Sequence, residues 1–589
     1  MNIKNNERLR KCIWIVLMIV IFVIPLIVTL NTVSIPNSLH LLYNSQKYSE
    51  LFLYGKAQIL HIGTLLCVIL TITYQLLTYK KEDWKKNRIS LILFGLFAVS
   101  IMISFVLSEN KQLAWLGMID RFEGTFTWLC YIGLTFVVMT IVKRRKEVNG
   151  LIISFVLSVS VVSLIGVFQI LGMDLFKTDL GMLMMLGSRY EELFMNVNFN
   201  FPEGRVYTTL YNPNYVGSLI ALAFPLTLYI IFVMKKWWIK LIFILSIVFQ
   251  LLALIGSESK GGFVAVIMTI VMLLIVVLIK KSNNKIISIG IIVAFTLAII
   301  ILVQLPVLES LKNQIKMSLD MGPENTFTTE FTSVEYNHPE IRYYLQNGEY
   351  ISVSPIEGGL DVESEGEGEV IQDEKNSRLI YKITSEAYIK QVIYEYKEGL
   401  VRVNIKNLEN EKSYESRFNY YYSGHFSVGT LPLNNENIHA ESIEIIKNGR
   451  FMSRRGYIWN RTIPMILEKP IFGYGADTYV VNFPQGDLIY KRELSGVHTT
   501  IVDKPHNMFL NIVVNFGLLG LLLFLATALY SIVQSRFSIL IIPILSYFVV
   551  GLVNDSVVFA SYMMFVIFGI LLVERNIEGY KGVWNNDFN

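Results

Sequence analysis

Long apolar segments are the feature of this sequence that most restricts what it can fold into. A stretch of roughly 18 or more apolar residues is long enough to cross a bilayer as a helix. About a dozen such stretches occur, near residues 12–30, 57–79, 89–107, 126–142, 150–172, 214–234, 237–256, 262–279, 286–305, 508–530, 537–553 and 557–573. The sequence therefore predicts a polytopic α-helical membrane protein with about 12 transmembrane helices.

The composition supports this fold class and excludes others. Of the 589 residues, 53% are hydrophobic and 17% are charged, whereas ordinary soluble domains carry about 25% charged residues. This disfavours a single soluble domain and excludes a disordered chain or a collagen-like fibre. The three cysteines, Cys12, Cys67 and Cys130, all lie inside apolar runs, so they form neither a disulfide scaffold nor a CxxC metal site.

Lysine and arginine are distributed unequally among the loops that connect the apolar segments. The N-terminus and the alternate loops at 80–88, 143–146, 235–240 and 280–285 are basic, while the intervening short loops hold few cations. Cytoplasmic loops carry an excess of Lys and Arg. We therefore expect a multi-pass protein of the cytoplasmic membrane with both termini in the cytoplasm.

One connection is far longer than the others. Residues 306–505 hold no apolar span, and a loop of this length on the extracytoplasmic side must contain folded structure. Within it, residues 380–408 alternate apolar and polar side chains, which is typical of half-buried strands. The acidic run at 361–374 is expected to be an exposed connection. The predicted organisation is transmembrane helices 1–9 at 1–305, an extracytoplasmic β-rich insertion at 306–450, an extracytoplasmic catalytic loop or cap at 451–505, and helices 10–12 with a short cytoplasmic tail at 506–589.

Several catalytic and transport signatures do not occur in the sequence. There is no phosphate-binding GxxxxGK[ST] loop, no HExxH, no G-x-S-x-G and no dinucleotide-binding glycine pattern, which disfavours an ATP-driven pump or a membrane zinc protease. The apolar segments also hold almost no charged residues near their centres, where ion-coupled transporters usually need them. We expect no metal ion, no cofactor and no nucleic-acid partner.

Polar residues gather instead at the predicted extracytoplasmic ends of the spans. Five clusters occur, at 121–128, 204–217, 257–262, 454–475 and 503–520, and each joins a cation or histidine to Gly, Pro or Asn. Arginine offers a rigid fork of donors that matches phosphate oxygens. Helix N-termini add anion-binding N–H groups, as at Asn212-Pro213-Asn214. The clusters therefore predict a site for a lipid-linked diphosphate at the outer surface of the membrane.

Taken in order, these clusters resemble the O-antigen ligase/polymerase (Wzy_C-type) family of membrane glycosyltransferases. The matching residues are Arg205 followed by the NPN sequence and Gly217, Ser259-Lys260-Gly261, the series Arg455, Trp459, Pro470, Gly473 and Gly475, and the series His506, Asn507, Leu510, Gly517 and Gly520. The resemblance covers residues 120–573 apart from the β-rich insertion. Lys260 stands where the family often has arginine.

The resemblance implies a fold, an activity and a set of site residues. The fold would be of the GT-C class, and the reaction would be a metal-independent, inverting transfer of a glycan from an undecaprenyl diphosphate carrier to an acceptor hydroxyl. The partners would be this donor, a glycan or other cell-envelope acceptor, and the lipid bilayer. The implied catalytic residues are His506 as the base and Arg205 and Arg455 on the diphosphate, and the implied substrate-binding residues are Arg121, Lys260, Asn212, Asn214 and Asn507.

Other interpretations of these residues stay open at this point. His506 could cap a helix or lie on the surface, Arg205 could be an interfacial anchor, and Arg121 could pair with Glu123 in a turn. Arg455 competes with Arg454 and Arg461 for one role, because basic stretches beside membranes often bind anionic lipid.

Alternative functions are a polysaccharide exporter or lipid-carrier flippase without transfer chemistry, and a receptor whose β domain binds a ligand. A flippase would need hydrophilic residues along several spans, and a receptor would need a cytoplasmic output module. The spans are mostly Leu, Ile, Val and Phe, and the predicted cytoplasmic loops are short, which argues against both alternatives. Ligase and polymerase cannot be separated, and the β-rich insertion could hold acceptor glycan on its tyrosines or serve as a structural lid.

Overall fold

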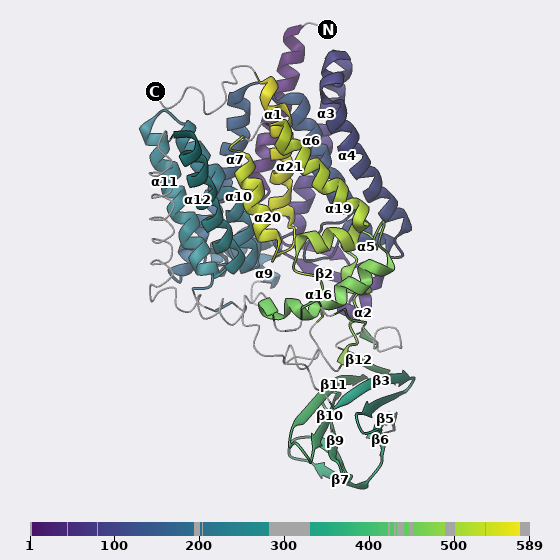
Figure 1. Ribbon diagram of the computed structural model, residues 1–589. Helices are drawn as coiled ribbons and strands as arrows, with labels where there is room; N and C mark the ends of the chain where they lie inside the picture. Colours follow the sequence, from purple (N-terminus) through teal and green to yellow (C-terminus); the bar gives the residue numbers. More distant parts are fainter. Residues whose placement is uncertain are drawn as a thin grey trace.

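The helices of this protein form one bundle, and strands β3–β13 form a separate body at one end of it (Figure 1). The computed structural model describes residues 3–43, 45–78, 81–193, 201–202, 204–281, 330–357, 359–421, 425–428, 431–432, 441–443, 445–446, 449, 451–488, 501–535 and 538–577. The predicted span at 286–305 lies outside the described residues.

Among the described residues, seven helices are long and apolar enough to cross a membrane. They are α3 (Tyr54–Thr78), α4 (Lys81–Leu107), α7 (Arg145–Ile170), α10 (Pro213–Val233), α11 (Trp237–Ser257), α19 (Met508–Gln534) and α21 (Val558–Val573). Shorter apolar helices are α6 (Thr125–Ile141), the first part of α12 (Lys260–Lys281) and α20 (Ile541–Gly551). The structure therefore confirms a multi-pass helical protein, while the count of 12 and the GT-C class remain predictions.

The first helix differs from its predicted position. The apolar segment near 12–30 predicts a span there, but α1 covers Ile3–Val23. The chain then enters β1 (Asn31–Ser34), which pairs antiparallel with β2 (Lys47–Glu50). The helix therefore begins within the basic N-terminal stretch and ends earlier than hydropathy suggests.

Helix α21 lies at the centre of the bundle. Its apolar segment is 94% buried inside the protein, whereas the corresponding segment of α11 is 28% buried. The ring of Phe565 on α21 stacks on Tyr131 of α6 with centroids 5.3 Å apart. A helix that is apolar on all sides can be buried on all sides, so α21 is the core around which the outer helices pack.

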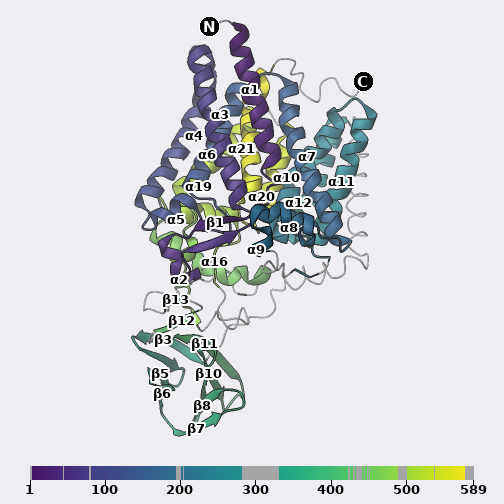
Figure 2. The ribbon, with the colours of Figure 1, turned by 180° about the vertical axis from the view of Figure 1, so that it is seen from behind.

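The basic N-terminal stretch and the basic loop at 143–146 meet at one end of the bundle. Arg10 of α1 forms a buried ion pair with Glu147 of α7 at 2.7 Å. The charge of Arg145 acts on Glu574, whose carboxylate accepts a hydrogen bond from Ser538 at 2.9 Å. This end lies opposite the strands (Figures 1 and 2). Its location in the cytoplasm stays a prediction.

The inserted strands form two antiparallel sheets that share one core. The strands are β3 (Phe331–Asn337), β4 (Glu340–Leu345), β5 (Tyr350–Ile356) and β6 (Gly359–Ser364) in one sheet, and β7 (Glu367–Asp373), β8 (Arg378–Thr384), β9 (Tyr388–Glu395), β10 (Leu400–Asn407), β11 (Ser413–Tyr421), β12 (His425–Val428) and β13 (Leu431–Pro432) in the other. Their core joins Ile341 and Val353 of the first sheet to Val392 and Val403 of the second. The predicted β-rich character is confirmed.

The acidic run at 361–374 is mostly exposed, as the sequence suggested, but it forms strands and not a connection. It contributes to β6 and to the edge strand β7, whose residues pair with β8. Strand pairing through the backbone accounts for this outcome, because glutamates on an edge strand can face solvent while their N–H and C=O groups are satisfied.

The short elements nearest the strands cover one end of the bundle. They include α2 (His40–Tyr43), α5 (Lys111–Leu116), α8 (Asp179–Leu186), α9 (Tyr190–Leu193), α16 (Phe451–Glu468) and α17 (Tyr479–Asn482). Helix α16 runs across this end between the bundle and the sheets (Figure 1). The helical character expected for the cap is therefore present in its described part.

Helix α19 is interrupted inside the bundle at Gly517, whose φ is +70° and ψ −178°. The segment after α16 runs alongside this break. Leu518 donates its N–H to Pro470 O at 2.7 Å, and Val514 O accepts from Tyr474 N at 2.9 Å. Backbone polar groups in a membrane must be satisfied within the protein, so the P-x-x-G-x-G segment supplies the partners that the broken helix needs.

We expect Gly517→Ala to destabilise the protein. The φ and ψ of this residue are essentially restricted to glycine, at a cost of about 1–3 kcal/mol for other residues, and an added Cβ would lie 2.1 Å from Ile471 O. Thermal unfolding of the purified protein measures the effect. Gly95→Ala in α4 is the control, since its Cβ would meet nothing within 4 Å. An unchanged midpoint for Gly517→Ala would contradict the role of the break.

Candidate functional site

His506 and Asp555 form a pair at the end of the bundle that faces the strands. His506 precedes α19, and Asp555 lies in the loop between α20 and α21. Nδ1 of His506 lies 3.1 Å from Oδ2 of Asp555, and the two side chains are 36% and 2% exposed. The carboxylate accepts from Nδ1–H, which leaves Nε2 of the neutral ring as a proton acceptor. The histidine predicted as the base is therefore held by a buried carboxylate.

The charge of Asp555 is maintained by its neighbours. Burial alone would raise the pKa of this carboxyl, but its hydrogen bond to His506 and the charges of His506, Arg121 and Lys504 bring the pKa below its ordinary value. An ionised Asp555 stabilises positive charge on the His506 ring. The pair is thus arranged so that the imidazole can accept a proton.

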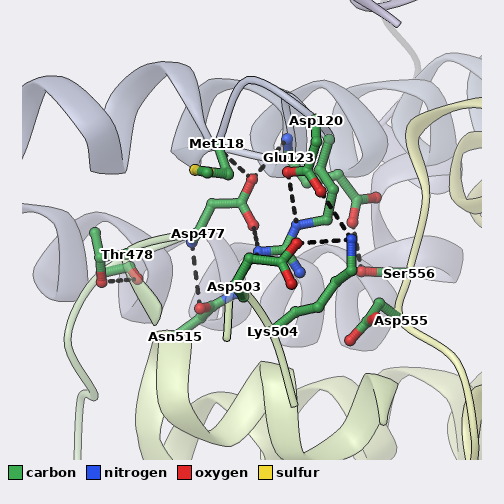
Figure 3. A network of polar contacts seen from close by, with 12 residues as sticks. Met118, Asp120, Glu123, Asp477, Thr478, Asp503, Lys504, Asn515, Asp555 and Ser556 are labelled. Atoms are coloured by element: carbon green, nitrogen blue, oxygen red, sulfur yellow. Dashed lines mark hydrogen bonds and ion pairs between the residues drawn. The ribbon is translucent and has the colours of Figure 1, made fainter. Parts of the chain in front are cut away.

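Lys504 ties the segment before His506 to the loop between α5 and α6 (Figure 3). Its Nζ lies 2.7 Å from Asp120 Oδ2 and 2.9 Å from Asp503 Oδ2, and it donates to the Tyr215 hydroxyl at 3.3 Å. Burial would raise the pKa of Asp503, but Lys504 first and then His506 hold it well below its ordinary range. These contacts hold in place the residues that directly precede His506.

Arg121 is buried in an ion pair with Asp477, at 2.6 Å between Nη2 and Oδ1. Asp477 also accepts from Met118 N at 2.8 Å and donates its own N–H to Asn515 Oδ1 at 3.2 Å (Figure 3). The partner of Arg121 is therefore Asp477 and not Glu123, which instead accepts from the Tyr131 hydroxyl at 2.7 Å. Arg121 joins the α5–α6 loop to the segment that runs along α19.

Arg455 lies on α16, one helical turn before Trp459, which donates its indole N–H to Pro505 O at 2.8 Å. This bond brings α16 against the residue that precedes His506. Nη1 of Arg455 donates to Met452 O at 2.7 Å, while its Nε is buried without a hydrogen-bond partner. Among the described residues no carboxylate lies within ion-pair distance of Arg455. Burial lowers its pKa, and the charge of Asp555 opposes this shift.

Lys260 adds a second cation beside Arg455. It is the first residue of α12, and its positive charge and that of Arg455 act unfavourably on each other. Two nearby cations favour an anion between or beside them, because the anion removes their mutual repulsion. Arg455 and Lys260 therefore form an electropositive region next to the His506–Asp555 pair.

Close packing of small residues places Lys260 at this position. A Cβ on Gly217 of α10 would lie 2.0 Å from Ser259 Oγ, and one on Gly262 would lie 2.6 Å from Gly217 Cα. The starts of α10 and α12 can touch only because these residues are small. The motif glycine Gly217 thus serves helix packing.

Arg205 is engaged by Glu258 in a partly exposed ion pair. Glu258 is the C-cap of α11 in a left-handed conformation, with φ +53°, and it lies two residues before Lys260. Val206 N donates to Gly256 O at 3.1 Å, which holds the two segments together. Arg205 therefore lies close to the start of α12, and its guanidinium is paired with the Glu258 carboxylate.

The three predicted asparagines take part in helix starts. Asn212 Oδ1 accepts from Asn214 N at 2.9 Å and Asn507 Oδ1 accepts from Phe509 N at 2.9 Å, as N-caps do. Asn507 also donates to Leu552 O at 2.9 Å. These caps hold α10, α19 and the loop that carries Asp555, and substrate contacts by the asparagines stay a prediction.

The structure adds residues that the sequence analysis missed, among them Asp555, Lys504, Asp120, Asp477 and Tyr215. The dipeptide Asn554-Asp555 between two apolar spans was a usable signal, since an acidic residue next to a membrane segment is often functional. The others carry no local signal. Among the described residues, no group of three or more His, Cys, Asp or Glu could hold a metal ion.

Part of the chain matches a known family. The model of the O-antigen ligase family (Wzy_C) matches residues 407–525, a stretch that contains α16, the segment along α19 and His506. The resemblance inferred from the motifs is confirmed for this part of the chain. A search of curated proteins returns no match.

We expect Asp477→Asn to destabilise the protein by about 3–5 kcal/mol, because it leaves the Arg121 guanidinium buried without its counter-charge. Glu258→Gln is the matched control. It also removes one carboxylate from an arginine, but in an exposed pair worth at most about 1 kcal/mol. Thermal unfolding of both variants beside the unmodified protein gives the comparison. Equal midpoints for the two variants would contradict the structural importance of the Arg121–Asp477 pair.

Proposed function

We propose that this chain, whose residues 407–525 match the O-antigen ligase family, is a membrane glycosyltransferase of the outer face of the cytoplasmic membrane. It would move a glycan from an undecaprenyl diphosphate-linked donor to an acceptor hydroxyl. The observation that carries the proposal is the His506–Asp555 pair beside Arg455, whose Nε has no hydrogen-bond partner. A base and an anion site at one place suit transfer from a diphosphate.

The proposed reaction is a single displacement with inversion. Nε2 of His506 takes the proton of the acceptor hydroxyl while the oxygen of that hydroxyl bonds to the anomeric carbon of the donor. The bond from that carbon to the diphosphate oxygen breaks, and the diphosphate leaves with the electron pair. Asp555 stabilises the imidazolium, while Arg455, Lys260 and Arg205 stabilise the leaving diphosphate. Cationic side chains supply the charge that a metal ion supplies in other transferases, so the proposed reaction is metal-independent.

This arrangement favours transfer over carrier export. A flippase moves its substrate without breaking a bond and has no use for a histidine held by a buried carboxylate. The ligase and polymerase forms of the reaction share this chemistry and differ only in the acceptor.

We expect His506→Ala to abolish glycan transfer while the protein stays folded, because the base is lost. Asp555→Asn should lower kcat by about 100-fold or more, within the range that general acid–base catalysis contributes. The assay uses protein in nanodiscs with a lipid-linked oligosaccharide donor. His338→Ala, on the remote β3–β4 turn, is the control. Normal turnover by His506→Ala would contradict the role of His506 as the base.

We expect Arg455→Gln to raise the KM for the lipid-linked donor, because a positive charge is lost from the diphosphate site. Glu258→Gln should have the opposite effect. Its carboxylate occupies the Arg205 guanidinium, and an exposed pair of this kind is worth at most about 1 kcal/mol, so the donor KM should fall by up to about fivefold. Steady-state kinetics with varied donor measure both effects. A donor KM raised by Glu258→Gln would show that Arg205 does not bind the donor.

The glycan that accumulates on the carrier in cells lacking this protein separates the two forms of the proposed reaction. A ligase leaves full-length lipid-linked polymer, and a polymerase leaves single repeat units. Analysis of the carrier-linked glycans by mass spectrometry makes the distinction, and an unchanged glycan pool would contradict both.

A further inference from the structure

The loop that carries Asp555 is held in place mainly by side chains. It connects α20 to α21, and among the described residues the backbone N–H groups of Asp555 and Ser556 form no hydrogen bond to another backbone group. The side chain of Asn554 donates to Ser218 Oγ of α10 at 3.3 Å. The hydroxyl of Ser556 donates to Glu123 Oε2 at 2.5 Å. The position of the Asp555 carboxylate therefore depends on the side chains of its two neighbours in the chain.

Glu123 joins this loop to the other buried charges of the site (Figure 3). The glutamate is 1% exposed, and its Oε1 accepts from the Tyr131 hydroxyl of α6 at 2.7 Å. Its own N–H donates to Asp477 Oδ2 at 3.3 Å, and Asp477 is the partner of Arg121. Through one residue, the Arg121–Asp477 pair is thus connected to the loop that carries Asp555.

Helix packing alone does not require a carboxyl group at position 123. Burial raises the pKa of Glu123 to about 7, and the hydrogen bonds from Ser556 and Tyr131 oppose this shift. Burying a polar group is unfavourable unless it is hydrogen-bonded, so an apolar side chain would suit this place better if packing were its only requirement. Both the ionised and the protonated carboxyl keep an oxygen that accepts from Ser556, so the contact holds in either protonation state.

The proposed base needs Asp555 at a fixed distance. Nδ1 of His506 lies 3.1 Å from Asp555 Oδ2, and a hydrogen bond weakens steeply when its geometry is lost. A misplacement of about 1 Å in an active site can lower the rate about 100-fold. Because Ser556 directly follows Asp555, the bond from its hydroxyl to Glu123 limits how far the carboxylate can move from His506.

We propose that Glu123 and Ser556 are positioning residues of the transfer reaction. By accepting the hydroxyl of Ser556, Glu123 holds the loop in the place where Asp555 stays hydrogen-bonded to His506. The inference rests on the proposed function, because that reaction uses His506 as its base. Glu123 and Ser556 take no part in the bond changes themselves, and both act through Asp555.

Ser556→Ala tests this role, because it removes the hydroxyl and adds no atoms. Ser538→Ala is the matched control, since Ser538 also donates to a buried glutamate, Glu574, at 2.9 Å, but at the opposite end of the bundle. We expect Ser556→Ala to lower kcat about tenfold with the donor KM unchanged, and Ser538→Ala to keep kcat. Steady-state kinetics in nanodiscs measure both. Ser556→Cys, whose thiol is a weak donor, gives the same test should Ser556→Ala not fold.

A double variant shows whether Ser556 acts through Asp555. Asp555→Ala leaves no carboxylate to position, so adding Ser556→Ala to it should lower kcat by less than about twofold, as expected of two residues that act together. A further tenfold loss in the double variant would mean that Ser556 acts independently of Asp555. An equal loss of kcat in Ser538→Ala would mean a general effect on the fold. Either result would overturn the inference.

Histidine NMR tests the positioning without any glycan transfer. The full chain contains seven histidines, so protein labelled with 15N-histidine gives few ring signals, and the spectrum of His506→Ala identifies the hydrogen-bonded Nδ1–H of His506. We expect this signal to weaken in Ser556→Ala and Ser556→Cys and to stay in Ser538→Ala.

The two measurements separate the positioning role from the proposed function. A weakened Nδ1–H signal in Ser556→Ala of a protein that transfers no glycan supports the placement of Asp555 by Ser556 and overturns the proposed function. Active transfer with an unchanged kcat and an unchanged signal in Ser556→Ala overturns the positioning role and leaves the proposed function intact. In an active protein, a change in only one of kcat and the signal also overturns the positioning role.

Discussion

The buried ion pair between Arg121 and Asp477 is the interaction on which the candidate site depends. Asp477 belongs to the segment whose backbone completes the interrupted helix α19, and Arg121 belongs to the loop whose Asp120 binds Lys504. A charge so deeply buried is tolerated only with its partner in place. The pair therefore connects α19, which begins just after His506, to the loop between α5 and α6, which binds the residues just before His506.

Charge is distributed unevenly around His506. On one side Asp120 and Asp503 both pair with Lys504, so the carboxylates there outnumber the ammonium group by one. On the other side Arg455 and Lys260 repel each other with Asp555 as the opposing charge that acts on Arg455. This polarity suits a reaction in which a neutral hydroxyl arrives from one side and an anionic leaving group departs on the other.

The sequence anticipated the fold and part of the site for definite physical reasons. Apolar spans can be recognised because a helix needs a long apolar stretch to cross a bilayer, and the alternation at 380–408 predicts strands because side chains on a strand alternate between faces. The edge strand β7 was not predicted, because a segment rich in glutamate is not typical of a strand even though its backbone pairs with β8. Asn507 carries a family motif, but its hydrogen bonds to the first turn of α19 are those of any good N-cap, and a motif alone does not separate capping from binding.

What the sequence by itself determined is the membrane character, the ordered polar clusters at the helix ends and the candidacy of His506, Arg455 and Lys260. These follow from hydropathy and side-chain chemistry, which are local properties. Only the tertiary structure decided which partners these residues have. Asp555 on His506, Asp477 on Arg121 and Glu258 on Arg205 are each distant in sequence from the residue they bind. Ion pairs form through space, and the packing of the helices that brings them together has no trace in the spacing of residues along the chain.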